Sequence, residues 1–175
     1  MPIRKHQKFN RPKKIFDITV IKEEQALIKK YGLKNRREVW KADFAIGKIR
    51  NIAKSLITAD KEKQDKFLET QKEKGFNVES IADVLGLKKE DYLKRRLQSL
   101  VFQKGIAKTP KQARQAITHK QIKIKGSIIN SPSHLTTLKE EMTIEPTREI
   151  TPKKEMSNEE KQVLNQIKAA ERREA

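Results

Sequence analysis

The sequence predicts an α+β fold with three parts: a mostly helical N-terminal body, a small helix-helix-β-hairpin module and an extended C-terminal tail. Three observations support this prediction. Apolar residues recur every three to four positions over much of 20–118, the pattern of helices with one buried face. The period becomes two over 119–129, as in a half-buried strand. The 175 residues suffice for one domain or two small ones that share a core.

The first 16 residues show no apolar period. They contain six basic residues and no acidic one, so residues 1–16 are expected to form an extended basic arm. A helical body is predicted to follow over 17–89. Its first helix covers about 20–31 and ends at Gly32, because glycine suits the left-handed backbone conformation after a helix.

The second predicted helix covers about 37–57 and has the strongest periodic pattern in the chain. Its expected buried stripe is Trp40, Ala45, Ile49, Ile52, Ala53 and Leu56. Charges alternate over 60–74, which indicates either a solvated helix or a variable excursion. Asn77 is the expected N-cap of a short helix that ends at Gly86.

The module is predicted to cover 90–145 and to begin with one helix from about 90 to 103, followed by a turn at Gly105. Thr109 and Pro110 have the chemistry of an N-cap and a first helical residue, so a second helix is expected there. The apolar sides of the two helices are Leu93, Leu97, Leu100 and Val101, then Ala113, Ala116 and Ile117.

A hairpin is expected after the second helix, because Ile122 and Ile124 alternate with lysines. Gly126-Ser127 is the predicted two-residue turn, of type II′ because glycine comes first. Residues 146–175 are predicted to be a linker, broken by proline, and a terminal helix that begins with a capping box of Ser157 and Glu160.

The charge distribution indicates a polyanionic partner. The formal net charge is +18, and residues 92–138 contain ten basic residues and no Asp or Glu. No apolar stretch is long enough for a membrane span, and the first residues are basic rather than apolar, so no membrane segment or secretory signal is expected. We therefore expect a soluble intracellular protein.

Catalytic chemistry is not expected. The chain has no cysteine, hence no disulfide or thiolate metal site, and its six glycines form no phosphate-binding loop. His6, His119 and His134 lack metal-ligand spacing. We expect no enzyme activity, cofactor, metal or small-molecule substrate. Trp40, Phe44 and Tyr92 lie at helical spacings, so core packing is the favoured interpretation for them.

The segment 95–135 reads RRLQSLVFQKGIAKTPKQARQAITHKQIKIKGSIINSPSHL. It closely resembles the RNA-binding module, of the alpha-L type, found in the small-subunit ribosomal protein S-four family. The matching features are Arg96-Leu97, Gly105-Ile106-Ala107, Gln112-Ala113-Arg114, Ile122-Lys123-Ile124 and Pro132-Ser133. Residues 31–50 and 84–98 resemble the archaeal and eukaryotic branch of this family. Gln98 and Lys120 depart from the aspartate and glycine frequent in the module.

The resemblance implies a structural constituent of the small ribosomal subunit. Such a protein binds 16S-like small-subunit rRNA, aids subunit assembly and contributes to translational fidelity. It lies in the cytoplasm near the mRNA entrance channel, beside ribosomal proteins S-three and S-five. The expected RNA-binding residues are Arg95, Arg96, Lys104, Lys108, Lys111, Arg114, His119, Lys120, Lys123 and Lys125 of the module, Arg4, Lys5 and Arg11 of the arm, and Lys41 and Lys48 of the second helix.

Arg114 is the strongest single candidate, because a guanidinium can hold a phosphate through two hydrogen bonds and no acidic residue of 92–138 opposes it. The main alternative is a nucleolar ribosome-biogenesis protein with the same module. An RNA-modifying enzyme is disfavoured, since the rest of the chain is too short for a catalytic domain. Charge alone leaves DNA or an anionic membrane open as the partner.

Overall fold

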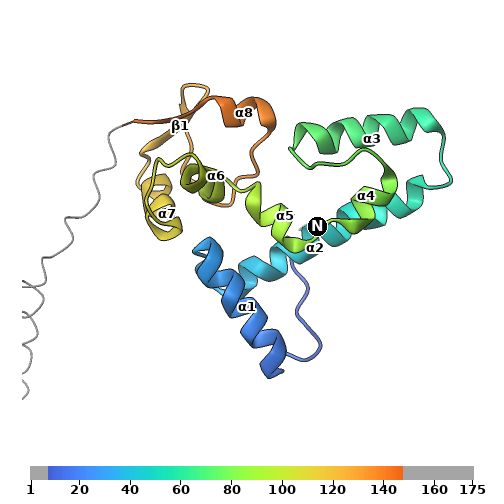
Figure 1. The fold of residues 1–175 in the computed structure, drawn as a ribbon, viewed down its shortest axis with the longest axis horizontal. Coiled ribbons are helices and arrows are strands. Elements are labelled where there is room, and N and C mark those ends of the chain that lie inside the picture. The colour runs from blue at the N-terminus through green and yellow to red at the C-terminus, as the bar shows by residue number, and fades with distance from the viewer. Residues whose placement is uncertain (1–7, 148–175) are drawn as a thin grey trace, which may run out of the picture.

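The structure, a computed structural model, describes residues 8–147 and has the predicted α+β architecture (Figure 1). Figure 1 shows α3 and α4 at one end and α6, α7 and the sheet at the other, with α2 and α5 between them. In chain order the elements are α1 (Ile18–Tyr31), α2 (Arg36–Leu56), α3 (Lys61–Glu73), α4 (Ile81–Gly86), α5 (Lys89–Lys94), α6 (Leu97–Gln103), α7 (Pro110–Thr118), β1 (Ile122–Ile124), β2 (Ser127–Ile128), α8 (Leu138–Met142) and β3 (Ile144–Pro146).

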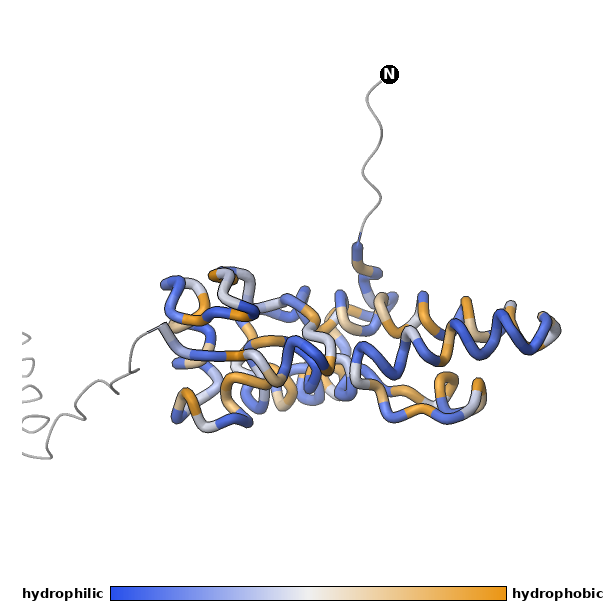
Figure 2. The backbone as a smooth tube through the Cα atoms, turned by 90° about the horizontal axis from the view of Figure 1, so that it is seen from above, coloured by the Kyte–Doolittle hydropathy of each residue, from blue (hydrophilic) through white to orange (hydrophobic). Residues whose placement is uncertain are grey.

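The buried apolar side chains form three clusters rather than one core. The first lies within the module, where α6 and α7 pack on the sheet. The second joins α1, α2 and α5, and the third joins α2 to α4 and the loops beside it. Along the elongated chain trace, hydrophobic and hydrophilic residues alternate within the helices (Figure 2). Because α2 contributes to two clusters, it is the axis on which the body is built.

Helix α1 ends as predicted. Gly32 has a φ of 61°, and the Leu33 amide donates to the Ile28 carbonyl at 3.0 Å, which closes a Schellman motif. Gly32 also lies against α7: a Cβ atom built on it would come within 2.8 Å of Pro110 Cβ. A side chain at position 32 would therefore separate α1 from α7.

Helix α2 has the predicted period, but its buried face is rotated from the expected one. Trp40 and Ala53 are buried as predicted, whereas Ile52 is 48% exposed. The buried stripe runs instead through Val39, Ala42, Ile46 and Ala53. The reason is that α2 is covered from two sides, by α1 with α5 and by α4, so its inner face is set by these neighbours.

The segment 60–74, predicted as a solvated helix or a variable excursion, contains the helix α3, in which Gln71 is the buried residue. The prediction that Asn77 caps the next helix is wrong. The N-cap of α4 is Ser80, whose hydroxyl accepts from the Asp83 amide, while the Asp83 carboxylate accepts from the Ser80 amide at 2.9 Å. A reciprocal capping box satisfies two free amides, which a cap three residues earlier could not do.

The predicted helix over 90–103 is wrong as a single element. Helix α5 ends at Lys94, Arg96 has an extended backbone, and α6 begins at Leu97. The Leu97 amide donates to the carbonyl of His134 at 2.8 Å, and Arg96 forms a β-bridge with Leu135. The break therefore occurs because a distant loop provides backbone partners at the point where a continuous helix would use its own.

Helix α7 begins as predicted, with the Thr109 hydroxyl accepting from the Gln112 amide at 3.1 Å and Pro110 in the first turn. The predicted type II′ turn at Gly126-Ser127 is wrong. Ile124 pairs with Ser127, so the turn is Lys125-Gly126, with φ of 49° and 77°. Two successive positive φ angles correspond to type I′, which matches the twist of the paired strands.

The sheet has a third strand that was not predicted. Strand order is β2-β1-β3, and both neighbours of β1 are antiparallel to it. Ile144 of β3 is buried in the core of the module, and α8 precedes it. The predicted C-terminal helix and most of the predicted linker lie outside the described residues. Across residues 8–147, no helix is long and apolar enough to cross a membrane.

Candidate nucleic-acid interface

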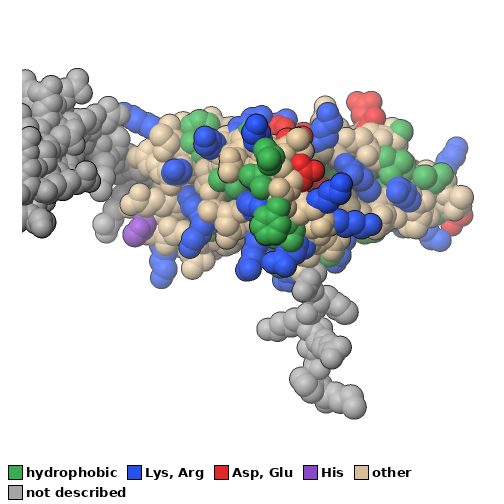
Figure 3. All heavy atoms as spheres, turned by 90° about the horizontal axis from the view of Figure 1, so that it is seen from below, with side chains coloured by type: hydrophobic (Ala, Val, Ile, Leu, Met, Phe, Trp, Pro, Cys, Tyr) green, Lys and Arg blue, Asp and Glu red, His purple; other side chains and the backbone are tan. Residues whose placement is uncertain are grey.

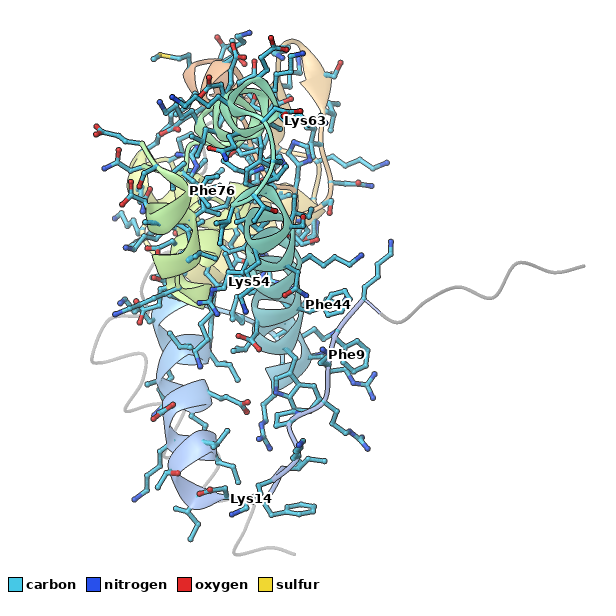
Figure 4. The ribbon with its side chains drawn as sticks, turned by 90° about the vertical axis from the view of Figure 1, so that its right-hand side faces the viewer. Phe9, Lys14, Phe44, Lys54, Lys63 and Phe76 are labelled. Atoms are coloured by element: carbon cyan, nitrogen blue, oxygen red, sulfur yellow. The ribbon has the colours of Figure 1, made fainter. Side chains whose placement is uncertain are left out.

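A hollow of about 650 Å³ lies where α2 faces α5 and α7. One face of helix α2 lines the hollow through side chains that recur at helical spacing. The chain around the break between α5 and α6 lines it as well. Residues 8–17, which form neither helix nor strand, run beside α2 (Figure 4). The lining residues are Lys8, Glu38, Lys41, Phe44, Ala45, Lys48, Tyr92, Arg96, Arg114, Pro132 and Ser133.

One carboxylate, that of Glu38, organises the arginines of this hollow. Arg114 donates to both of its oxygens, at 2.7 and 3.2 Å, and Arg96 donates to Oε2 at 2.9 Å. Burial alone would raise the pKa of Glu38, but the hydrogen bond from Arg114 and the positive charges of Arg96 and Arg114 outweigh it, so the pKa is lowered. Glu38 is therefore a stable anion that ties α2 to the module.

The amide of Gln98 forms a second link between body and module. Gln98 is buried, and its Nε2 lies 3.0 Å from the Tyr31 carbonyl and 2.9 Å from those of Gly32 and Pro110. Its Oε1 accepts from Arg114 at 3.3 Å. The glutamine thus joins the end of α1, the start of α7 and the arginine cluster.

Aromatic rings alternate with basic side chains along the exposed side of α2. Phe9 and Phe44 project to the same side of α2 (Figure 4), and the Phe9 ring stacks on Trp40 with 6.1 Å between centroids. The Lys48 ammonium lies 5.1 Å from the centre of the Phe44 ring. Bases stack on aromatic rings and phosphates bind cations, so this side of α2 has both kinds of group that single-stranded nucleic acid requires.

Comparison with known proteins bears on this arrangement. Residues 95–141 match the family model of the S4 domain. The small ribosomal subunit protein uS4 of Korarchaeum cryptofilum is 40% identical over 149 residues, which cover 82% of this chain and 90% of that protein. The uS4 protein of Methanoregula boonei is 39% identical over 154 residues, covering 82% and 83%. That of Methanococcus aeolicus is 42% identical over 131 residues, covering 71% and 74%.

The chain belongs to the small ribosomal subunit protein uS4 family. The resemblance to the archaeal and eukaryotic branch of the family is thereby confirmed, and these three relatives are archaeal. The S4 domain match covers α6, α7 and the β1–β2 hairpin, ends before β3, and begins at the arginine pair that breaks the helix.

Several cations expected to contact RNA are exposed in this uS4 family member. Lys41 and Lys48 line the hollow, whereas Lys108 and Lys111 lie at the start of α7. His119 and Lys120 follow at the junction of α7 with β1, where Lys120 has a φ of 60°, whereas Lys123 lies within β1 and is half-buried. Within the described residues, none of these six lysines makes an ion pair.

Other expected cations are engaged within the protein. Arg95 donates to the Lys74 and Thr136 carbonyls and, at 2.8 Å, to the Glu141 carboxylate. Lys104 donates to the Glu141 carbonyl, and Lys125 lies 3.8 Å from the Glu140 carboxylate.

Of the cations expected in the basic arm, Arg11 is exposed beside α2, and Arg4 and Lys5 lie outside the described residues.

Residues 92–138 contain no acidic residue, but Arg114 is still opposed by one, because Glu38 reaches it from another helix. Arg96 is 4% exposed and pairs with the same carboxylate. The two arginines therefore have a structural partner already, whatever further ligand they hold.

Sequence reasoning missed Lys8, Glu38 and Ser133 as members of the site, and it favoured core packing over base stacking for Phe44. Core packing is confirmed for Trp40, which is buried, and for Tyr92, which packs against two apolar clusters and also lines the hollow. A signal for Phe44 was present. The spacing Lys41, Phe44, Lys48 places one ring between two cations on the same helical face. No pattern in the sequence could have linked Glu38 to Arg114, since 76 positions separate them.

Proposed function

We propose that this protein is a structural constituent of the small ribosomal subunit and binds small-subunit rRNA directly. The observation that carries the proposal is the convergence of α2 and α7 on a basic hollow, in which Lys41 and Lys48 stand beside Arg96 and Arg114. Membership of the uS4 family supports the ribosome as the setting. Figure 3 shows Lys and Arg side chains spread over one face of the molecule with few acidic ones among them.

We propose the exposed cations of this surface and the half-buried Lys123 as phosphate contacts. They are Lys41 and Lys48 on α2, Lys108 and Lys111 at the start of α7, and His119, Lys120 and Lys123 beyond it. Arg114 and Arg96 position this surface through Glu38. A surface of this kind reads phosphates and helix shape more than base sequence, since the deep groove of double-helical RNA is closed to side chains.

A matched pair of variants tests this interface. Replacement of Lys41 and Lys48 together by alanine should weaken binding to a small-subunit rRNA fragment. It should also flatten the dependence of log affinity on log salt by up to ~0.9 per lost phosphate contact, the value for duplex DNA. The matched control is Lys61→Ala with Lys66→Ala, which removes the same charge from α3, away from the hollow.

The control pair should leave affinity and salt slope close to those of the native protein. Equal loss in both double variants would mean that net charge alone drives binding, and the proposed interface would be wrong. Arg114 is a poor probe for this purpose, because its removal also leaves the buried Glu38 carboxylate with one partner fewer.

The finer role follows from the resemblance to the S-four family. We infer that the protein joins the subunit early in assembly and lies in the cytoplasmic ribosome beside S-three and S-five. There it contacts mRNA at the entrance channel and contributes to decoding fidelity. Depletion of the protein should then reduce mature small subunits and raise misreading of a reporter message; normal subunit levels and fidelity would contradict this role.

A nucleolar ribosome-biogenesis function is the alternative, since such a protein shares the module. Sedimentation in high-salt gradients separates the two. A constituent of the ribosome remains with mature small subunits, whereas a biogenesis protein is found with precursor RNA. The 90% coverage of an archaeal uS4 protein favours the first outcome.

A further inference from the structure

Within residues 8–147, the hollow between α2, α5 and α7 is lined by more positive than negative charge. Five of its lining residues are basic, namely Lys8, Lys41, Lys48, Arg96 and Arg114, and Glu38 is the acidic residue among them. Such an excess in a partly enclosed space with low-dielectric walls concentrates the electrostatic field and attracts an anion.

Arg96 gives a second, independent indication of an anionic ligand. Its side chain lines the hollow and is 5% exposed. The guanidinium donates to Glu38, but its Nε is buried and has no hydrogen-bond partner within the described residues. A buried cation with an unused donor is costly, and the cost falls when an anion arrives beside it.

The rest of the lining favours a ligand that carries a ring as well as a phosphate. Phe44, Tyr92, Ala45 and Pro132 give the hollow an apolar wall. The Phe44 ring is held between α2 and the Lys48 ammonium, which stabilises it as a stacking surface. The volume of about 650 Å³ lies in the range of small-molecule sites and exceeds what a phosphate alone would fill.

We propose that this hollow takes one unstacked nucleotide, with its phosphate on the lysines and arginines and its base against Phe44. The inference deepens the proposed function: a nucleotide turned out of the bound rRNA is the expected occupant. A free mononucleotide has the same chemistry and is the other possible source. A paired duplex cannot enter, because its bases are stacked inside the helix.

An abasic scan of the RNA tests the extruded nucleotide. Each unpaired position of a small-subunit rRNA fragment is replaced in turn by an abasic residue, which keeps the phosphate and removes the base. For the native protein, one position should weaken binding about tenfold, as expected for loss of base–aromatic stacking. For Phe44→Leu, the same abasic substitution should have little further effect, because the stacking surface is already lost.

Two variants control for folding and for non-specific effects. Phe44→Tyr keeps an aromatic ring and should restore the sensitivity to the abasic position. Phe102→Leu removes an exposed ring from α6, outside the hollow, and should behave like the native protein. Circular dichroism melting of each variant confirms that the fold is retained.

Calorimetric titration with uridine and adenosine 5′-monophosphates and with inorganic phosphate tests the free-nucleotide source. Preference for a mononucleotide over phosphate that is lost in Phe44→Leu, without any abasic effect, supports a site filled by free nucleotides. No abasic position coupled to Phe44 and equal binding of phosphate and mononucleotides would overturn the proposal. Weaker rRNA binding after replacement of Lys41 and Lys48, with no abasic position coupled to Phe44, would support the proposed function and contradict the extruded nucleotide. Failure of the nucleotide site is therefore distinguishable from failure of the proposed function.

Discussion

Gln98 occupies a position where a single side chain decides how two parts of the chain fit together. Its buried amide reaches three backbone carbonyls, two at the end of α1 and one at the start of α7. A buried carbonyl that loses its donor costs the desolvation energy of that group. The glutamine that departs from the aspartate frequent in related modules therefore has a structural use, since carboxylate oxygens could not donate to these carbonyls.

Gln98→Leu keeps the size of the side chain and removes its donors. We expect the free energy of unfolding to fall by about 2–3 kcal/mol, as two or three carbonyls are left unsatisfied. Urea denaturation followed by circular dichroism measures this change. The control is Gln115→Leu, on the exposed side of α7, which should change stability by less than about 0.5 kcal/mol. A similar loss of unfolding free energy in the two variants would contradict the role of Gln98 in joining α1 to α7.

Glu38 makes part of the stability depend on pH. Its pKa in the folded protein is lowered below the ordinary 4.5, so its contribution is present above that value. The contribution is lost as the pH falls through the lowered pKa, when protonation removes the partner of Arg96 and Arg114. At neutral pH, Glu38→Gln should therefore lower the free energy of unfolding by about 2 kcal/mol, since two arginines lose their counter-ion.

The difference between native protein and Glu38→Gln should shrink when the pH is lowered from 7 to 3.5. Urea denaturation at several pH values measures it, with Glu23→Gln on the exposed side of α1 as the control. A difference that stays constant over this range would show that the charge of Glu38 does not contribute to the stability.

Two glycines of this fold differ in what the structure requires of them, depending on whether they lie at the end of a helix or within one. Gly32 combines both: its φ of 61° is required by the helix end, and its missing side chain lets α7 approach α1. Gly47 is the opposite case. It lies within α2, and a Cβ atom there would meet nothing within 4 Å.

Alanine at these two glycines should therefore have opposite effects. Gly32→Ala should destabilise the protein by about 2 kcal/mol, since an L-residue in the left-handed region costs ~1–2 kcal/mol and the methyl group also strikes Pro110. Gly47→Ala should stabilise it by roughly 0.5–1 kcal/mol, the difference in helix propensity. Thermal denaturation of both variants gives the sign directly. A stabilising Gly32→Ala would contradict the close approach of α1 and α7.

Polar links between the body and the module help to hold the two together as one unit. The Glu38 pair with Arg96 and Arg114, the Gln98 amide, and Arg95 with the Lys74 carbonyl all join segments distant in sequence. Two of these links also border the proposed RNA surface. The orientation of α2 relative to α7, and so the shape of the basic hollow, therefore depends on buried polar contacts as well as on apolar packing.

The segment 150–175 is expected to be dispensable for this unit. It contains six basic and five acidic residues, and its apolar stripe of Val163, Leu164 and Ile167 is too short to stabilise a free helix. Deletion of 150–175 should leave the urea midpoint and the rRNA affinity close to those of the full chain. Limited proteolysis provides a second test: protection of these residues equal to that of α6 and α7 would contradict the expectation.

Local chemistry in the sequence was enough to predict most helices and the character of the surface. The Gly32 stop, the Thr109-Pro110 start, the apolar side of α7 and the alternation in β1 are preferences of neighbouring residues, and all four appear as expected. The basic excess and the motifs of 95–135 likewise predicted the family. Such features can be predicted from the sequence because the interactions that stabilise them lie within a few residues of one another.

The folded chain alone decided the features that depend on distant partners. The helix breaks before Leu97 because His134 offers a carbonyl, β3 pairs with β1 although β2 and α8 lie between them in the chain, and Glu38 pairs with Arg114. In each case an intrinsic preference of the segment is weaker than a hydrogen bond or ion pair formed in a buried place. Since burial and partners are set by packing, these choices could not be read from the order of residues.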